Sequence, residues 1–190
     1  MRVYDAIMNR RSIRKFSQTP ILHEDLLELV RCAGMAAYPA NLQPLKFALV
    51  TDEKECKELF ACTKWAGYLE NGTPEEAKRP TAYLVMLGDT NIKKGDMQVE
   101  VGAAGMTITL AALEKGIATC WLGALQREKI AEILALPEHL EVKDVIAMGY
   151  PAQKSRPVAM KDGNVKYDLD EDGVLNVPKR SLEEILYTKD

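Results

Sequence analysis

The stretch YLVML at residues 83–87 carries the most information about the fold. Five apolar residues follow one another without alternation, which is typical of a β-strand buried on both faces. Working outward from it, further strand patterns occupy residues 47–50, 117–122 and 142–148, and helical patterns separate them. The longest helical pattern, residues 98–115, carries charged groups only near its ends. The alternation predicts an α/β or α+β fold in which a central β-sheet has helices on both faces.

Shorter helices are predicted by the spacing of apolar residues. They are expected at residues 3–9, 53–63 and 127–134, and from His23 to about Gly34. A last helix is expected to begin at Ser181, since Ser181 and Glu184 have the spacing of a capping box.

The length of 190 residues suits a single domain, taken here as residues 1–190. Asp-Gly pairs at residues 162–163 and 172–173 are turn signals between short alternating segments. They predict a hairpin excursion over residues 158–177 that precedes the C-terminal segment.

Composition excludes several classes of protein. The formal net charge is −3, which argues against a nucleic-acid-binding face. The sequence contains no run of about 18 apolar residues, so no membrane helix is expected. The N-terminus lacks the apolar region of a secretory signal. We therefore expect a cytoplasmic protein with no membrane partner. The four cysteines form no Cys-x-x-Cys pair and the two histidines are far apart, so no metal site is expected.

The segment NRRSIRKF at residues 9–16 concentrates positive charge. Arginine presents a planar fork of donors that suits phosphate oxygens. Arg10 and Arg14 fall on one side of the chain in either a helix or a strand, and Ser12 joins them only in an extended segment. The segment is thus a candidate phosphate clamp, and the alternative is a solvated basic turn.

Three other sites add to this cluster. Asn41 and Gln43 place two carboxamides on a proline-stiffened loop, where they can read the edge of a heterocycle or simply make a turn. Gly123 follows a strand and lets a backbone N–H approach a flat ligand, or it only ends the strand. Lys179 and Arg180 precede a predicted helix and either complete a phosphate site or remain an exposed basic pair. Together these features match the needs of a mononucleotide with a flat redox ring.

Four sequence blocks resemble those of the nitroreductase family of FMN-dependent oxidoreductases. NRRSIRKF at 9–16 is similar to its opening signature, and PANLQPLKF at 39–47 is similar to its second. TCWLG at 119–123 and GYP at 149–151 resemble its later blocks, in the same order. Leu45 stands where the family usually has tryptophan, which should alter packing rather than abolish cofactor binding.

The resemblance implies an α+β nitroreductase-like fold with a mixed central β-sheet flanked by helices. It also implies a homodimer with FMN at the subunit interface. Lys179 and Arg180 are preferred as the C-terminal phosphate contacts, while Lys154 and Arg156 remain an alternative. The residues that it implies for cofactor binding are Arg10, Arg11, Ser12, Arg14, Pro39, Ala40, Asn41, Gln43, Leu122, Gly123, Lys179 and Arg180.

The resemblance also implies the reaction. NADH or NADPH would give hydride to flavin N5, and a nitroaromatic or quinone acceptor would then take the same place in a ping-pong cycle. No catalytic side chain is nominated, because the chemistry takes place on the flavin. Two alternatives remain: another flavin reaction on this fold, such as reductive dehalogenation or flavin fragmentation, and a nucleotide-binding module without turnover.

Overall fold

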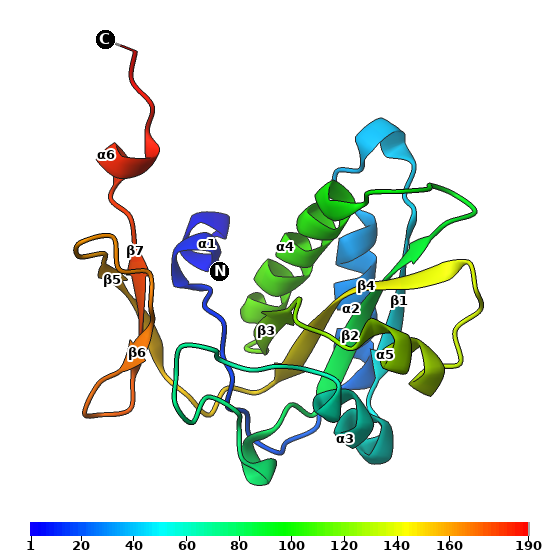
Figure 1. Cartoon of the computed structure of the whole chain (residues 1–190), viewed down its shortest axis with the longest axis horizontal. Coiled ribbons are helices and arrows are strands. Elements are labelled where there is room, and N and C mark those ends of the chain that lie inside the picture. The colour runs from blue at the N-terminus through cyan, green and yellow to red at the C-terminus, as the bar shows by residue number, and fades with distance from the viewer. Residues whose placement is uncertain (190) are drawn as a thin grey trace.

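The structure is a computed structural model, and it describes residues 1–189. Its central sheet has four strands in the order β1-β2-β4-β3, and every neighbouring pair is antiparallel (Figure 1). A parallel bridge between Ser12 and Thr119 adds the N-terminal segment to the β3 edge, so the sheet is mixed there. The strands are β1 (Leu45–Val50), β2 (Ala82–Asp89), β3 (Ala118–Leu122) and β4 (Leu140–Gly149).

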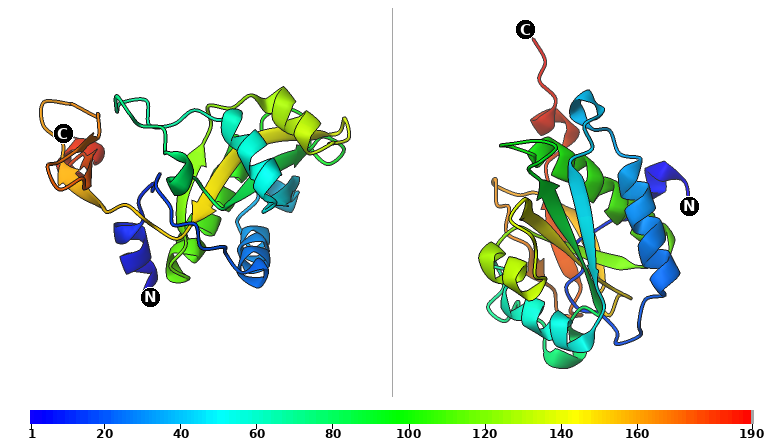
Figure 2. Two further views of the ribbon diagram at one scale, coloured as in Figure 1. Left: turned by 90° about the horizontal axis from the view of Figure 1, so that it is seen from below. Right: turned by 90° about the vertical axis from the view of Figure 1, so that its right-hand side faces the viewer.

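Helices cover both faces of this sheet, as the sequence predicts (Figure 2). Helices α2 (His23–Gly34) and α4 (Gln98–Glu114) pack on one face, and α3 (Glu53–Ala61) and α5 (Arg127–Ile133) pack on the other. Strand β2 is buried along its whole length. Tyr83 and Val85 belong to the core under α3 and α5, whereas Leu84 and Met86 belong to the core under α2 and α4. The unbroken apolar run therefore supplies both cores.

A second, smaller sheet follows the main one and forms a separate lobe (Figure 1). Strand β5 (Ser155–Ala159) runs parallel to β7 (Leu175–Lys179), and β6 (Asp168–Leu169) pairs with β7 in an antiparallel hairpin. The hairpin of β6 and β7 thus lies in the region of the excursion predicted for residues 158–177, and β5 pairs with β7 on its other side. The remaining elements are α1 (Val3–Asn9), the 3₁₀ turns η1 (Pro39–Asn41) and η2 (Glu76–Lys78), and α6 (Leu182–Ile185).

The last helix begins as the capping-box spacing predicts. The Glu184 backbone N–H donates to Ser181 Oγ over 3.3 Å, and the Ser181 N–H donates to Glu184 Oε2 over 2.8 Å. Its apolar side chains are nevertheless exposed, since Leu182 and Ile185 each keep 66% of their surface. None of the helices within residues 1–189 is both long enough and apolar enough to cross a membrane.

Helix α4 lies at the centre of the molecule and has one covered and one open side. A Cβ on Gly105 would overlap the Trp121 ring of β3, so this glycine is required for packing within the chain. Gly102 has no neighbour within 4 Å of an added Cβ. Val99 and Met106 lie three and four residues away from it and are exposed. This open stripe is a surface that another backbone can approach closely.

Candidate functional site

The basic N-terminal segment lies along the outer edge of β3. The Ile13 N–H donates to the Thr119 carbonyl over 2.9 Å, next to the bridge between Ser12 and Thr119. Phe16 anchors the far end of the segment, because its side chain is fully buried. Gly149 makes room for that ring, since a Cβ there would lie 2.9 Å from Phe16. Backbone pairing and one buried ring therefore fix the directions of the arginines around Ser12.

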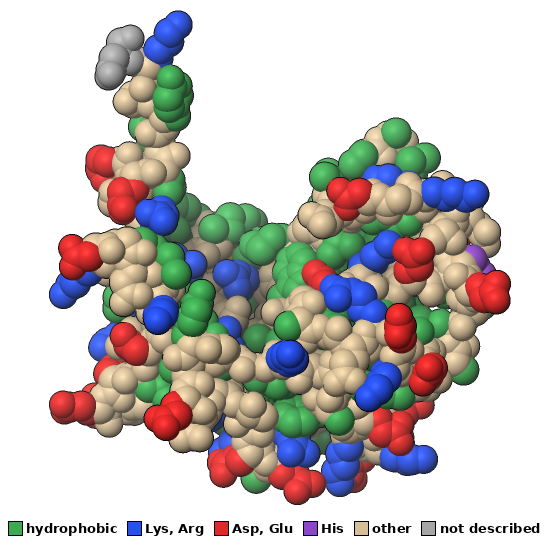
Figure 3. All heavy atoms as spheres, in the orientation of Figure 1, with side chains coloured by type: hydrophobic (Ala, Val, Ile, Leu, Met, Phe, Trp, Pro, Cys, Tyr) green, Lys and Arg blue, Asp and Glu red, His purple; other side chains and the backbone are tan. Residues whose placement is uncertain are grey.

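Two of these arginines reach a cavity of about 260 Å³ beside the C-terminal end of α4. The cavity is built by the N-terminal segment, the last turns of α4, the start of β3 and the chain that follows β4. Figure 3 shows a hollow between the β5–β7 lobe and the main body, with basic side chains on its floor. The polar residues that line the cavity are Asn9, Arg10, Arg11, Thr109, Thr119, Gln153 and Ser155.

Within residues 1–189, no ion pair joins a carboxylate to Arg10, Arg11 or Lys179. Partial burial and then the charges of Arg11 and Arg10 lower the pKa of Lys179, which places the three cations together. Burial and then the charge of Arg10 also lower the pKa of Arg11. The Arg11 Nε is buried and has no hydrogen-bond partner in residues 1–189. Three cations and an orphaned donor fit a phosphate, which would accept those hydrogen bonds and neutralise the charge.

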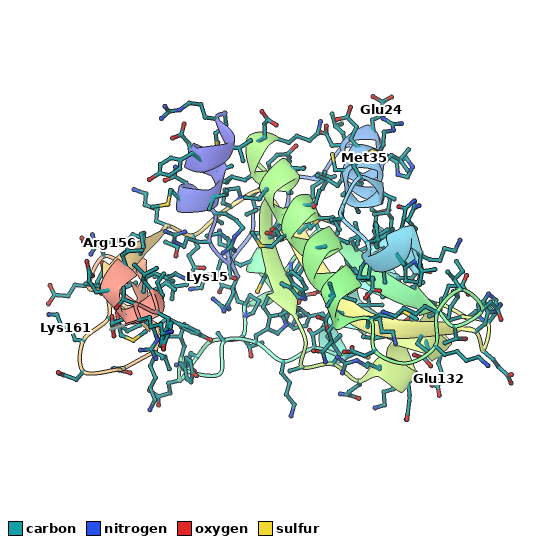
Figure 4. All side chains as sticks on the ribbon, turned by 90° about the horizontal axis from the view of Figure 1, so that it is seen from above. Lys15, Glu24, Met35, Glu132, Arg156 and Lys161 are labelled. Carbon is teal, nitrogen blue, oxygen red and sulfur yellow. The ribbon has the colours of Figure 1, made fainter. Side chains whose placement is uncertain are left out.

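The basic residues near the C-terminus that are candidate phosphate contacts have different surroundings. Only Lys179 senses the charges of Arg10 and Arg11, whereas the Arg180 Nη1 lies 3.4 Å from Glu184 Oε1. Arg156 donates to Asn176 Oδ1 and to Asp170 Oδ2, both over 2.8 Å, so its charge is already paired. In Figure 4, Arg156 lies on the β5–β7 lobe, while Lys15 lies between that lobe and the main sheet. Lys154 is exposed beside Lys15 in a different cavity.

Arg14 lies farther along β3 than the phosphate cluster. Burial raises the pKa of Cys120 to about 11, and the positive charge of Arg14 opposes that shift. The Arg14 backbone N–H donates to Gln153 Oε1 over 3.2 Å, and its guanidinium lies 4.6 Å from the centre of the Tyr167 ring. Sequence reasoning missed Gln153 and Tyr167, because no local pattern distinguishes either residue from its neighbours.

The far end of β3 presents backbone rather than side chains. Leu122 is buried, and Gly123 is exposed. The Gly123 carbonyl accepts a hydrogen bond from Arg127 Nη2 over 3.1 Å. Asp144 completes this support, since it accepts from Trp121 Nε1 over 2.7 Å and from Arg127 Nη2 over 3.3 Å. The turn at Gly123 is thus held in place while its outer side stays open.

The amide loop lies elsewhere in the same chain. Ala40, Asn41 and Gln43 all have φ near +50°, and the Gln43 Nε2 donates to Asn41 Oδ1 over 3.1 Å. The loop and the preceding Pro39 are exposed. It precedes β1, whereas the arginines lie at β3, and these strands are the two opposite edges of the sheet. About three strand spacings of roughly 4.8 Å separate those edges, so the amides and the arginines lie at different edges of one chain's sheet.

No cluster of three or more His, Cys, Asp or Glu side chains in the part of the chain that the structure describes could hold a metal ion. The candidate site is consequently an anion pocket at one end of β3, a lone guanidinium midway, and a backbone turn at the other end.

Comparisons with known proteins identify the family. A sequence model described as the nitroreductase family matches residues 7–150. A relative from Archaeoglobus fulgidus, provisionally named NADH dehydrogenase/NAD(P)H nitroreductase, is 33% identical over 152 residues, which cover 76% of this chain and 83% of the relative.

Two solved structures are similar over almost the whole chain. A nitroreductase family protein from Clostridium novyi NT is 26% identical with a TM-score of 0.68, covering 97% of this chain and 98% of the other. A protein from Desulfovibrio desulfuricans, described provisionally as a nitroreductase in complex with FMN, is 24% identical with a TM-score of 0.72, covering 100% and 98%. The family model matches residues 7–150 and the Archaeoglobus fulgidus relative is 33% identical, so the chain belongs to the nitroreductase family.

Proposed function

We propose that this protein is an FMN-dependent oxidoreductase that takes reducing equivalents from NADH or NADPH and passes them to a small acceptor of the nitroaromatic or quinone type. The observation that carries the proposal is the uncompensated cluster of Arg10, Arg11 and Lys179 at one end of β3. Such a cluster suits a phosphate tail, and the N-terminal segment beside β3 leads from it to the exposed turn at Gly123.

Each part of the site has a role toward the proposed cofactor. Arg10, Arg11 and Lys179 would hold the phosphate, and Ser12 would contribute its hydroxyl nearby. Arg14, midway along β3, would lie beside the ring and favour extra negative charge there. The backbone groups at Gly123 would approach the far side of the ring. When bound, FMN would supply hydride-transfer chemistry, which the side chains of this site do not provide.

The part played by the chain is binding, orientation and electrostatics. Arg127 and Asp144 hold the turn at Gly123 through the hydrogen bonds described above, so its peptide groups are already oriented before a ligand arrives. Solvent water is accessible at this exposed turn and can supply protons. We therefore assign no side chain as nucleophile or general base. In the proposed ping-pong cycle the nicotinamide and the acceptor occupy the same place in turn.

The position of the amide loop supports a homodimer with the cofactor at the subunit interface. Asn41 and Gln43 lie at the sheet edge opposite to Arg10 and Arg11, so the loop would serve the site of a second copy. Exposed apolar side chains offer a surface for that copy. They are Val3, Tyr4, Ile7 and Met8 of α1, and Val99 and Met106 of α4.

The proposal is tested by the visible spectrum of the purified protein, before and after addition of FMN. We expect tight FMN binding in a 1:1 ratio to the chain and bleaching by NADH or NADPH without oxygen. Addition of a nitroaromatic or a quinone should then restore the oxidised spectrum. Protein that neither carries nor takes up FMN would contradict the proposal and favour a nucleotide-binding module. Bound FMN that is consumed, or an acceptor that loses halide, would instead favour flavin fragmentation or reductive dehalogenation.

A further inference from the structure

Three segments that are distant in the sequence meet around Arg14. The Arg14 guanidinium carbon lies 4.6 Å from the centre of the Tyr167 ring, which comes from the excursion between β5 and β6. The Tyr68 ring, from the loop after α3, lies 5.0 Å from the Tyr167 ring at a tilt of 58°. The three side chains therefore form a column of one cation and two rings. Neither tyrosine has a part in the function proposed above.

The column is tied at one end to the turn at Gly123. The Lys64 N–H donates to the Ala124 carbonyl over 3.1 Å, and the Gln126 N–H donates to the Cys62 carbonyl over 2.9 Å. These bonds attach the loop that carries Tyr68 to the residues that follow Gly123. The rings consequently bridge the β5–β7 lobe and the main sheet, across the strip of β3 where the flat ring of a cofactor would lie.

The electrostatic setting of Arg14 differs from that of the other well-fixed arginines. Arg127 and Arg156 each form an ion pair with an aspartate, at 3.3 and 2.8 Å. Within residues 1–189, Arg14 has no carboxylate within ion-pair distance, and the face of Tyr167 is its recorded side-chain contact. A ring face attracts a guanidinium without neutralising it, and it leaves the in-plane N–H donors free. Arg14 is thus held in place with its full charge and its donors available.

We propose that Tyr167, supported by Tyr68, is a positioning residue that holds the Arg14 guanidinium beside the ring of bound FMN. This inference rests on the proposed function and deepens it. A positive charge fixed at that place favours the more negative, reduced form of the cofactor over the oxidised form. Both rings act through Arg14 and have no direct part in the redox step.

The test compares Tyr167→Leu with Tyr167→Phe, which keeps the ring face and removes only the hydroxyl. Two quantities are measured for each variant: the dissociation constant of FMN, by fluorescence quenching, and the midpoint potential of the bound cofactor. We expect Tyr167→Leu to weaken FMN binding about 3- to 30-fold, the range of one cation–π contact. The potential should become more negative, by about 30 mV for each tenfold greater loss of affinity in the reduced form. Tyr167→Phe should stay close to the wild type in both.

The Arg14→Gln background distinguishes the positioning of Arg14 from a merely structural role of Tyr167. In the Arg14→Gln background, Tyr167→Leu should leave the potential unchanged, because no charge remains to be positioned. An equal shift in both backgrounds would overturn the inference, and so would a wild-type potential in the Tyr167→Leu single variant. A raised KM for the acceptor with an unchanged potential would assign the rings to acceptor binding instead.

Tyr68→Leu is the second variant in case Tyr167→Leu fails to fold. Tyr68 is 52% exposed, so its replacement leaves the core intact. It should shift the potential in the same direction by a smaller amount, and no shift would count against the column. These outcomes are separable from failure of the proposed function, because that failure appears already in the wild type as an absence of FMN binding.

Discussion

Lys179 shows at the scale of one residue how the free protein is prepared for an anion. Its pKa is lowered by burial and by Arg11 and Arg10, so the chain holds this proton less firmly than an ordinary lysine does. A bound phosphate dianion would offset the charges of Arg10 and Arg11 and raise the pKa again. Cofactor binding and protonation of Lys179 are consequently coupled, and the coupling has a definite sign.

We predict that FMN affinity is constant just above neutral pH and falls as the pH rises through the lowered pKa of Lys179. Above that pKa the free lysine is neutral, and binding must take up a proton. The phosphate itself is a dianion above about pH 6, so it does not contribute to the slope. The measurement is the FMN dissociation constant between about pH 7 and pH 10. Lys179→Arg should remove the slope with little loss of affinity, and riboflavin, which lacks the phosphate, should show no slope. A slope that persists in Lys179→Arg would contradict the assignment.

Arg11 is predicted to affect stability and binding in opposite directions. Its Nε is buried without a partner, and an unsatisfied buried donor costs about 1–3 kcal/mol. Arg11→Met should therefore raise the free energy of unfolding of the cofactor-free protein, measured with urea. The same variant should weaken FMN binding by about 1.5–3 kcal/mol, the range for a hydrogen bond to a charged group. Loss of both stability and binding would show that Arg11 holds the fold rather than the ligand.

The sequence was sufficient to predict a phosphate clamp but not its full membership. Residues 9–16 are marked by composition alone. The choice between Lys179, Arg180 and Arg156 depends on which carboxylates lie nearby. Arg180 is paired with Glu184, and Arg156 is paired with Asp170. Tyr167 joins Arg14 only through the path of the excursion, which no local pattern encodes. The roles assigned to these residues stay predictions until binding is measured.

At the scale of secondary-structure elements, glycine positions in α4 separate packing within the chain from packing outside it. The Trp121 ring fills the space beside Gly105, whereas the space beside Gly102 is open. The sequence alone gives no means of telling which partner each glycine meets. The structure assigns Gly105 to the strand beneath the helix.

Gly105→Ala is predicted to lower the free energy of unfolding by about 1–3 kcal/mol, because the added methyl group overpacks the contact with Trp121. The measurement is urea unfolding followed by circular dichroism. Gly34→Ala, at the end of α2, is the matched control, since nothing lies within 4 Å of its added Cβ. It should be neutral or slightly stabilising. Equal effects of the two substitutions would mean that helix propensity, and not the Trp121 contact, governs α4.

Elements with a local signal were predicted well, and long-range pairing was not. Helix α4 and strand β2 are long apolar runs, and the structure places them within a few residues of the prediction. The capping box of α6 was also read correctly. The parallel pairing of β5 with β7 was missed, because it joins strands separated by the whole excursion and leaves only turn signals in the sequence.

For the whole molecule, the separation of the two halves of the site is the decisive feature. The amide loop precedes β1 and the cations lie at β3, on opposite edges of one sheet. In the proposed dimer the two groups would meet without any change in the fold, and the dimer surface would include the open stripe of α4 at Gly102. That residues 1–190 form one domain stays a prediction.

Gly102→Leu is predicted to weaken the dimer. The open position accepts a larger side chain within one chain, but a leucine would hold a second backbone away from α4. The measurement is sedimentation equilibrium over a dilution series, with retention of FMN followed in the same samples. A variant that dimerises and retains FMN as the wild type does would remove this stripe from the interface.

The most direct test of a shared site is complementation between two defective chains. One chain carries Arg10→Ala and Arg11→Ala, and the other carries Asn41→Ala and Gln43→Ala, so that each alone should bind FMN weakly. If each site takes its cations from one chain and its amides from the other, a mixed dimer contains one intact site, and we predict about one tightly bound FMN for every two chains. If each chain builds its site alone, the mixed dimer contains no intact site, and the absence of any tightly bound FMN would contradict the account.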